Sequence, residues 1–468
     1  NTFTDLYVLD LHGNSLKKEK SPDGGKDVNV FDIQQGVAIA LFVKNPKKKL
    51  PGTVHHAELW GERGKKYKWL EKYEMDKTKW EKLSPNSPFY FFVPKSEEGR
   101  EEYEKYWKVP DIFPLNSTGI VTARDSFVID FEKDELKKRI TMFRNLDLPD
   151  EIIAQTFGLK DTRGWKMSEE RKRLAKDVKW EEKFQRVLYR LFDIRWIYYT
   201  QQMVDWPRPE VMQNMLHSNL ALETSRMTKG EEFGHAFVSQ NISEVILLSP
   251  KTSNNAFVFP LYLYPSPDSH SENLFDTPTT EKKPNITEDF LKELKKKLKA
   301  TPKPEQIFTY IYALLYSPGY RTRYAEFLKS DFPRIPITSD TKLFDALAKL
   351  GQELVDLHLL KSKVLEKPIV KFEGSGEAKA EVRKYDEKKK AVRINDRQCF
   401  TGIPLEVWIY QIGGYQVLDK WLKDRKGRIL SSEDIRHYCR VTTALVETIK
   451  LQKEIDEVIE KHGGWPIR

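Results

Sequence analysis

FDIQQGVAIALFVKN (residues 31–45) is the stretch that decides how the start of this chain folds. An uninterrupted apolar run at residues 37–43 follows a Gln-Gln-Gly step and ends before Lys44. A short apolar run bounded by polar residues is typical of a strand that is buried on both faces. The run therefore predicts the last inner strand of a large sheet, although it lies close to the first residue of the chain. We expect the sheet to be incomplete here, and part of this apolar surface to be exposed or covered by another chain.

Further strands are predicted on both sides of this run, within residues 1–95. They are LYVLDL (6–11), VHHAELWG (54–61) and PFYFFVPK (88–95). The polar segment at residues 12–29 is rich in Gly, Asn, Asp and Lys and is predicted to be an exposed loop. Together these strands indicate the end of an α/β sheet.

The character of the chain changes at about residue 96. A short strand pair around a turn is predicted at 117–131, and charged helices are predicted between 133 and 188. Aromatic strand-like pieces follow, namely FDIRWIYYT (192–200), LALETSR (220–226), HAFVSQ (235–240), VILLS (245–249) and FVFPLYLYP (257–265). Apolar residues at helical spacing predict helices around 307–315 and 343–357.

The last part of the chain, residues 371–468, begins with a highly charged hairpin candidate at 371–395. A final helix is predicted after the capping pattern Ser431-x-x-Asp434, and Gly463 and Gly464 mark its end. The predicted fold class is α+β: the remnant of an α/β sheet (1–95), a mixed α/β region (96–370) and a hairpin with a helical C-terminal section (371–468).

Composition limits the classes of function. The 468 residues carry 79 Lys and Arg against 70 Asp and Glu, a net charge of +9. This excess fits a polyanionic partner, although a solvated basic surface explains it equally well. The two cysteines, Cys399 and Cys439, are typical of a protein in the reducing cytoplasm. No run of 18 apolar residues occurs, so we expect a cytoplasmic protein that does not contact a membrane.

The sequence contains no complete set of catalytic residues. FEGSG at 372–376 matches an F-x-G-x-G cofactor loop, but alternating charged residues follow it where such a loop requires a helix. His55 and His56 are neighbours in a predicted strand, so their side chains point to opposite faces. His358 lies in an apolar helical segment and is predicted to be a core histidine. We therefore expect no catalytic residue, no cofactor site and no metal site in this chain.

Signals for binding are stronger. The segment YRLFDIRWIYYTQQMVDWPRPEVM (189–212) places arginines among aromatic side chains, and GYRTRYAEFLKSDFPRIP (319–336) has two arginines at a turn entering a helix. Arginine bonds phosphates and guanine edges, and aromatic rings stack on bases. The alternative remains open that the aromatic residues form core and the arginines form ion pairs. The basic cluster at 420–428 near a helix end could equally complement the helix dipole.

These segments together resemble a known family. Residues 7–44 look like the late strands of the adenine-N6 methyltransferase domain in type ISP restriction-modification enzymes. FDIRWIYYT, PRPEVM (207–212), FVFPLYLYP, residues 310–336 and IGGYQVLDKWLKDRKGR (412–428) are similar to the target-recognition region that follows this domain. TGIVTARDSFVI (118–129) is similar to the opening of target-recognition domains in several amino-methyltransferases.

The resemblance implies a fragment of a larger enzyme that methylates adenine at N6 in an asymmetric DNA site and cuts unmodified DNA. Residues 1–95 would end the methyltransferase domain, 96–370 would be the DNA target-recognition domain, and 371–468 would complete the recognition region. The cofactor loop, the Asn-Pro-Pro-aromatic motif, the motor and the nuclease are missing. S-adenosylmethionine, ATP and magnesium are thus implied only for the full-length enzyme, and we expect this chain alone to be inactive.

Duplex DNA and the missing regions of the same polypeptide are the expected partners. The candidate DNA-binding residues are Arg195, Arg208, Arg226, Arg124, Arg321, Arg323, Lys17, Lys18, Lys20, Trp196 and Tyr199. Three alternatives stay open: a self-sufficient enzyme, a protein-interaction scaffold, and the recognition part of a phage-defence adenine methyltransferase without a fused nuclease.

Overall fold

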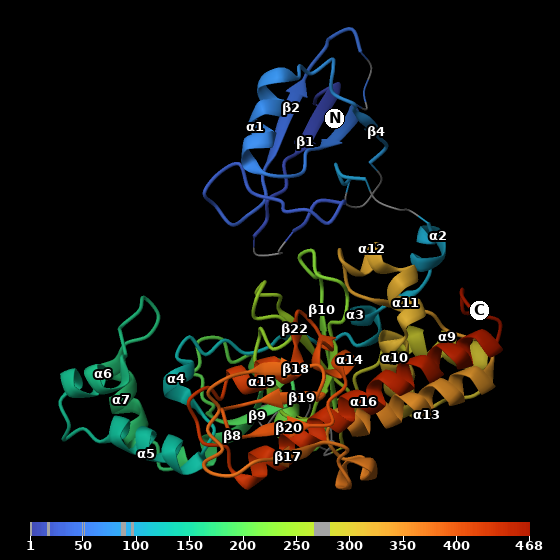
Figure 1. Ribbon diagram of the computed structural model, residues 1–468. Helices are drawn as coiled ribbons and strands as arrows, with labels where there is room; N and C mark the ends of the chain where they lie inside the picture. Colours follow the sequence, from blue (N-terminus) through green and yellow to red (C-terminus); the bar gives the residue numbers. More distant parts are fainter. Residues whose placement is uncertain are drawn as a thin grey trace, which may run out of the picture. The chain divides into compact units, whose positions relative to one another are not determined.

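The chain forms two compact units, Asn1–Glu98 and Gly99–Arg468 (Figure 1). The computed structural model describes residues 2–15, 19–48, 50, 52–85, 90–94, 98–265 and 281–468. The change of character predicted at about residue 96 lies close to the boundary between the two units.

Unit 1 is built on a four-stranded sheet with the order β2-β1-β3-β4. Its elements are β1 (Asp5–Asp10), β2 (Ala38–Val43), β3 (Thr53–Glu58), α1 (Arg63–Lys72) and β4 (Glu81–Leu83). Strand β1 is antiparallel to β2 and parallel to β3. The first three predicted strands are thus confirmed. The fourth is wrong in its described part, because residues 90–94 form no strand and β4 takes the place beside β3.

Strand β2 occupies an edge of this sheet, so the prediction that it is an inner strand is wrong for this chain. All six of its residues are exposed, and the side chain of Phe42 is 51% exposed. Among the described residues, only β1 pairs with β2. The expectation of an exposed apolar surface is therefore confirmed, and the physical reason is that no further strand covers this edge.

A buried ion pair fixes the polar segment that follows β1. The Lys66 ammonium of α1 lies 2.7 Å from Asp27 Oδ1, and both side chains are fully buried. Lys66 also donates to the carbonyls of Leu11 and Val28, and Asp27 accepts from the backbone N–H groups of Gly13 and Gly61. A charge can be buried in this way only if it is paired and hydrogen-bonded. The segment at 12–29 is consequently not the fully exposed loop that we predicted.

Unit 2 contains two four-stranded sheets made largely from the aromatic pieces of the sequence. One has the order β11 (Ala236–Ser239), β10 (Ala221–Ser225), β13 (Ala256–Pro260) and β6 (Ser117–Thr118). The other has the order β12 (Ile242–Ser243), β8 (Phe184–Arg190), β9 (Asp193–Tyr198) and β7 (Ile129–Asp130).

Two local predictions for these sheets are wrong. Strands β6 and β7 do not pair with each other: the short helix α4 (Asp125–Val128) separates them, and each joins a different sheet. Residues 245–249 form turns where we expected a strand. Smaller two-stranded pairs are β14 (Tyr262–Leu263) with β15 (Lys283–Pro284), β5 (Trp107–Lys108) with β16 (Arg334–Ile335), and β21 (Gln411–Ile412) with β22 (Tyr415–Gln416).

The charged helices predicted between 133 and 188 are confirmed and lie together at one side of unit 2 (Figure 1). They are α5 (Lys133–Arg144), α6 (Asp150–Phe157), α7 (Met167–Lys176) and the 3-10 turn η1 (Trp180–Lys183). Short helices elsewhere are α2 (Arg100–Tyr103), α3 (Val109–Ile112), α8 (Pro209–Met212), η2 (Gln213–Leu216), α11 (Pro318–Arg323), α12 (Ala325–Leu328), η3 (Lys363–Glu366), α14 (Leu405–Trp408) and α15 (Val417–Lys423).

The longer helices carry the centre of the core. They are α9 (Glu288–Leu298), α10 (Pro304–Tyr316), α13 (Thr341–His358) and α16 (Ser432–Lys461), and α16 begins with the predicted Ser431 and Asp434 capping box. Gly351 lets α13 approach α10 closely, because a Cβ atom there would lie 1.9 Å from the Thr309 carbonyl oxygen. His358 is buried and bonds the Tyr312 and Thr448 hydroxyls, which confirms it as a core histidine.

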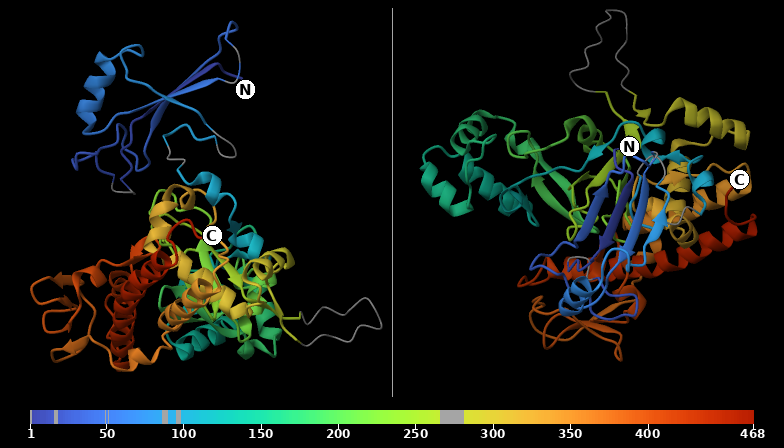
Figure 2. Two further views of the ribbon diagram at one scale, coloured as in Figure 1. Left: turned by 90° about the vertical axis from the view of Figure 1, so that its right-hand side faces the viewer. Right: turned by 90° about the horizontal axis from the view of Figure 1, so that it is seen from above.

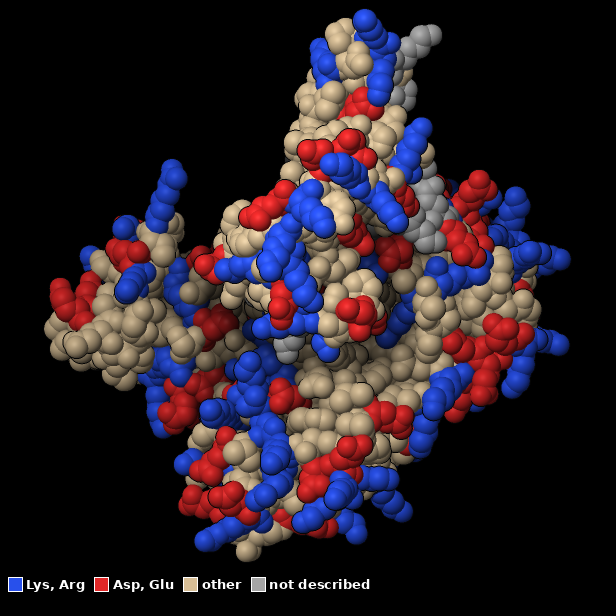
Figure 3. All heavy atoms as spheres, turned by 45° about the horizontal axis from the view of Figure 1, so that its top comes forward, with Lys and Arg blue, Asp and Glu red and all other residues tan. Residues whose placement is uncertain are grey.

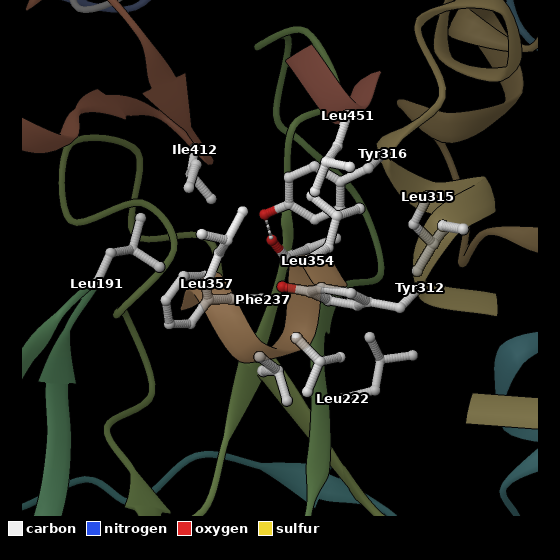
Figure 4. Close-up of a cluster of buried hydrophobic side chains, with 14 of the residues drawn as sticks. Leu191, Leu222, Phe237, Tyr312, Leu315, Tyr316, Leu354, Leu357, Ile412 and Leu451 are labelled. Atoms are coloured by element: carbon white, nitrogen blue, oxygen red, sulfur yellow. Dashed lines mark hydrogen bonds between the residues drawn. The ribbon is translucent and has the colours of Figure 1, made fainter. Parts of the chain in front are cut away.

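This core continues through the last part of the chain. Figure 4 shows side chains of the sheets, of α10, α13 and α16, and of β21 pointing into one cluster. A third four-stranded sheet, β17 (Lys371–Glu373), β20 (Cys399–Thr401), β19 (Ala391–Arg393) and β18 (Lys384–Asp386), lies on the other side of α16 from α10 and α13 (Figure 2). The predicted hairpin is thus β18 with β19. The predicted boundary between residues 370 and 371 falls inside the core.

Glu223 is an acidic group buried at the centre of β10. Its Oε1 accepts a hydrogen bond of 2.5 Å from the Ser243 hydroxyl, and among the described residues Oε2 has no hydrogen-bond partner. Burial raises the pKa of Glu223 from 4.5 to about 8. The carboxyl group is therefore mainly protonated at neutral pH in the folded protein.

We predict that Glu223→Gln removes a pH-dependent loss of stability. Between pH 4.5 and 8 the folded state holds a proton that the unfolded state has released, so stability falls as pH rises through this range. The neutral amide has no such proton to lose. Its thermal midpoint should exceed that of the wild type at pH 9 and change less between pH 5 and 9. Thermal midpoints that change with pH in the same way in the wild type and in Glu223→Gln would contradict this prediction. The control is Glu406→Gln, because Glu406 is exposed.

Candidate nucleic-acid interface

The β8–β9 hairpin, which carries the predicted Arg195 and Trp196, is tied to the C-terminal part of unit 2 by Asp193. Arg195 Nη2 donates to Asp193 Oδ2 at 2.6 Å, and Arg425 Nη2 donates to Asp193 Oδ1 at 2.9 Å. We call these three residues the Asp193 clasp. Burial alone would raise the pKa of Asp193, but the guanidinium groups of Arg425 and Arg195 outweigh it and hold the pKa below its usual value.

Phe131 forms the apolar side of the Asp193 clasp. The guanidinium carbons of Arg195, Arg428 and Arg425 lie 4.1, 4.1 and 4.8 Å from its ring centroid. Only 12% of the Arg195 side chain is exposed. Its hydrogen-bonding groups and its charge are thus used within the protein, and we leave it out of the proposed DNA contacts.

Arg124 is a second predicted contact whose guanidinium is used within the protein. It donates to the carbonyls of Thr122 and Met203 and to Asp205 Oδ1 at 2.6 Å, and it stacks on the Trp165 ring at 4.1 Å. Only 7% of the side chain is exposed. Arg124 therefore fixes the loop at 200–208 against residues 121–125, and we leave it out of the proposed contacts as well.

The same loop presents three other aromatic or basic residues. The Tyr199 hydroxyl donates to the Pro207 carbonyl at 2.6 Å, and the Arg208 guanidinium lies 4.6 Å from the Trp206 ring centroid. Trp206 itself is 57% exposed. Trp206 belongs to the segment 189–212, in which arginines stand among aromatic residues, but it is not one of the predicted DNA contacts. A tryptophan between Asp205 and Pro207, outside any alternating strand pattern, was the signal that could have found it.

Trp196 lies on the exposed side of the β8–β9 hairpin and is half-buried. The Lys133 ammonium and the Arg186 guanidinium each lie 4.8 Å from its ring. These two cations occupy the surroundings of the ring, so Trp196 is less free than Trp206 to contact another molecule.

Arg226 directly follows β10 and is well exposed. Its side chain is 58% exposed, and its Nε lies 3.7 Å from Asp331 Oδ1, a distance too long for a hydrogen bond. The loop after it is held in place by Glu231, which bonds the His235 ring at 3.0 Å and the Ser249 hydroxyl at 3.0 Å. An exposed charge at the end of a hydrogen-bonded strand is well suited to contact a phosphate.

The two predicted arginines of α11 have different environments. Arg321 is half-buried, donates from Nε to the Leu315 carbonyl at 2.7 Å and stacks on Tyr316. Arg323 donates to both carboxylate oxygens of Glu102, at 2.7 and 3.1 Å, and this pairing lowers the pKa of Glu102. Both arginines thus already have protein partners.

The three predicted lysines belong to unit 1. Lys17 and Lys18 lie outside the described residues, and Lys20 is exposed. The other candidates belong to unit 2.

Backbone hydrogen bonds bring the loops that carry Trp206 and Arg226 to one edge of unit 2. Trp206 and Val121 exchange two of them, at 3.0 and 3.2 Å, and Val245 N–H donates to the Ile120 carbonyl. Ala256 donates to Val245 and pairs with Ser225, the residue before Arg226. We call this edge, with the exposed Trp206 and Arg226 and the half-buried Arg208, the loop edge.

Acidic and basic side chains are mixed on the face of the molecule that Figure 3 draws. Individual contacts, rather than the net charge of +9, therefore have to define a binding surface.

The described residues contain neither a cluster of metal-ligating side chains nor a membrane-spanning helix. Within the described ranges, no group of three or more His, Cys, Asp or Glu residues is placed to hold a metal ion. No helix in these ranges is both long and apolar enough to span a bilayer. The F-x-G-x-G match at 372–376 lies at the end of β17 and leads toward β18 without a helix, so these residues do not fit an S-adenosylmethionine loop.

Comparison with known proteins identifies the family. Residues 111–455 match the type ISP C-terminal specificity domain, so the chain belongs to this family. No curated protein matches the chain.

Three solved structures share the fold over 97% of this chain. The DrdV–DNA complex has a TM-score of 0.74 and 22% identity, with 48% of its chain covered. The ATP-dependent type ISP restriction-modification enzyme LlaBIII bound to DNA has a TM-score of 0.73, 21% identity and 31% coverage. A nuclease-deletion mutant of the type ISP enzyme LlaGI, in complex with a DNA substrate mimic, has a TM-score of 0.69 and 19% identity, with 37% of its chain covered. This chain therefore spans less than half the length of each, and the α+β fold class is confirmed.

We predict that Asp193→Asn strongly destabilises unit 2. The substitution leaves Arg195 and Arg425 in a buried site without their anion, and breaking a buried ion pair costs about 3–5 kcal/mol. Denaturant unfolding should show a lower midpoint with intact secondary structure in water. The control is Asp396→Asn, because the Asp396 carboxylate is fully exposed and forms only a loose contact of 3.6 Å with Arg393. Equal, small effects of both substitutions would show that the Asp193 clasp does not hold the two parts together.

Proposed function

We propose that this chain recognises a specific sequence in duplex DNA, as the specificity region of a type ISP restriction-modification enzyme. The observation that carries the proposal is the family match over residues 111–455. The loop edge supports it, because it presents a phosphate-binding type of side chain and an aromatic ring side by side. Phosphate contacts would position the duplex, and a small number of base-edge contacts would define the sequence.

The contact set that we propose is narrower than the one predicted from sequence. Arg208 and Arg226 are its basic members, because among the described residues neither forms a close hydrogen-bonded ion pair. Arg195 and Arg124 position the loops that carry these contacts. Arg321, Arg323, Trp196 and Tyr199 stay candidates whose side chains already contact other parts of the protein, and Lys20 stays a candidate in unit 1.

We further propose that the parent enzyme methylates adenine at N6 and cleaves unmodified DNA in the cytoplasm, using S-adenosylmethionine, ATP and magnesium bound elsewhere in the polypeptide. Unit 1 would then be the end of its methyltransferase domain. The exposed edge strand β2 supports this assignment, since it could pair with a further strand of such a domain. The alternative parent is a phage-defence adenine methyltransferase without a fused nuclease, in which this chain would recognise DNA in the same way.

A protein-interaction scaffold is the second candidate function. The exposed apolar residues of β2 favour it, because a free strand edge is a template for pairing with another chain. Such a scaffold would bind DNA weakly and independently of sequence, so DNA binding separates the two candidates.

We predict that the chain binds a mixed-sequence 30-base-pair duplex at low salt and that the affinity falls steeply with salt. Each phosphate contact contributes about −0.9 to the slope of log K against log salt concentration. Arg226→Ala should lower the affinity several-fold and reduce this slope by about 0.9, measured by fluorescence anisotropy. The control is Lys295→Ala on α9, which is exposed and contributes nothing to the loop edge. Folded protein that fails to bind at low salt would overturn the proposed function.

A further inference from the structure

Trp206 is unusual among the aromatic residues of unit 2. Across its described residues, 99–265 and 281–468, it is the only exposed aromatic side chain, and every other one is half-buried or buried. Exposing an indole to water has a cost because the ring is large and mainly apolar. A single aromatic ring left in water at the loop edge is thus a candidate for contact with another molecule.

The backbone around Trp206 is fixed. Its N–H donates to the Val121 carbonyl at 3.0 Å and its carbonyl accepts from Val121 N–H at 3.2 Å. The Tyr199 hydroxyl holds the next carbonyl, that of Pro207. The backbone that carries the indole is therefore ordered, and a partner does not have to order the loop when it binds.

Arg208 is placed beside the indole by a backbone conformation that few residues with a side chain adopt. Its φ and ψ angles are 55° and 52°, in the left-handed region. This conformation puts the guanidinium 4.6 Å from the Trp206 ring centroid, and Nε has no hydrogen-bond partner among the described residues. Backbone strain of this kind is found preferentially at functional sites.

The charge of Arg208 is not neutralised locally. Asp205 and Glu210 are the nearest acidic residues in sequence; the Asp205 carboxylate is taken by the buried Arg124 at 2.6 Å, and no ion pair between Arg208 and Glu210 is found among the described residues. No ion pair of Arg208 is found in the described part of the chain. The loop thus presents one exposed aromatic face beside the half-buried guanidinium of Arg208.

We propose that Trp206 and Arg208 bind one nucleotide of the DNA together: the open face of the indole lies against a base or its deoxyribose, and the guanidinium bonds the adjacent phosphate. This inference rests on the proposed function. An apolar protein partner would require a contiguous apolar patch, but the exposed neighbours in the loop are Gln201, Gln202 and Asp205. A planar ring beside a cation fits a nucleotide, which has a planar base and a negative charge.

The two side chains should have separable effects on binding of a mixed-sequence 30-base-pair duplex. Trp206→Ala should weaken binding about tenfold with an unchanged salt slope, because stacking does not release counterions. Trp206→Phe should restore most of the affinity. Arg208→Ala should weaken binding and reduce the salt slope by about 0.9, whereas Arg208→Lys should retain the slope.

Contact is tested directly by photo-cross-linking to the same duplex with 5-iodouracil in place of thymine. We expect the peptide that contains Trp206 to be labelled in the wild type and the label to be lost from Trp206→Ala. Val178→Ala is the matched control, because Val178 is an exposed apolar residue outside the loop edge. Thermal midpoints equal to that of the wild type verify that the variants are folded.

The outcomes distinguish this inference from the proposed function. Wild-type binding that is unaffected by Trp206→Ala, or affected only as much as by Val178→Ala, overturns the role of the indole and leaves DNA recognition standing. Absence of any wild-type binding at low salt overturns both.

Discussion

The rest of unit 2 depends on one buried electrostatic interaction, the contact of Asp193 with Arg195 and Arg425. It joins residues more than 200 positions apart in sequence and fixes the β8–β9 hairpin against the segment that follows α15. Two guanidinium groups offset the cost of burying the carboxylate, and Phe131 excludes water from one side of the cluster. Strand β8 pairs with β12, and the backbone of Ile120 forms hydrogen bonds with Ser243 of β12 and with Val245. The β8–β9 hairpin therefore also positions the loop edge.

The distribution of arginines follows from this architecture. The guanidinium group tolerates partial burial because it is planar and has five donors, and Arg124 and Arg195 use this capacity to connect loops. Arginines that hold a scaffold are not available to bind a phosphate. The exposed Arg226 and the half-buried Arg208 remain; phosphate contacts of this kind position the duplex, whereas base-edge contacts determine the target.

Local sequence patterns predicted most of the elements but only part of the interface. Strands β1 and β3, helices α10 and α13 and the Ser431 capping box follow from apolar spacing and local hydrogen bonding, which are determined by neighbouring residues. The partner of Arg195 in the Asp193 clasp lies far away in the sequence, so no local pattern could show that its charge is used internally. Exposure of Trp206 was equally hidden, because it depends on which loops cover the ring. Strand β2 has the composition of a buried strand, yet among the described residues only β1 pairs with it and all six of its residues are exposed.

The most direct test of the account is selection from a pool of duplexes with a randomised central segment. The chain is incubated with the pool at moderate salt, and the bound DNA is sequenced after several rounds. The account predicts enrichment of one asymmetric motif, and Arg226→Ala should retain less DNA but enrich the same motif. Retention of DNA without enrichment of any motif, by protein that is folded and binds in a salt-dependent manner, would contradict the claim that this chain recognises a DNA sequence.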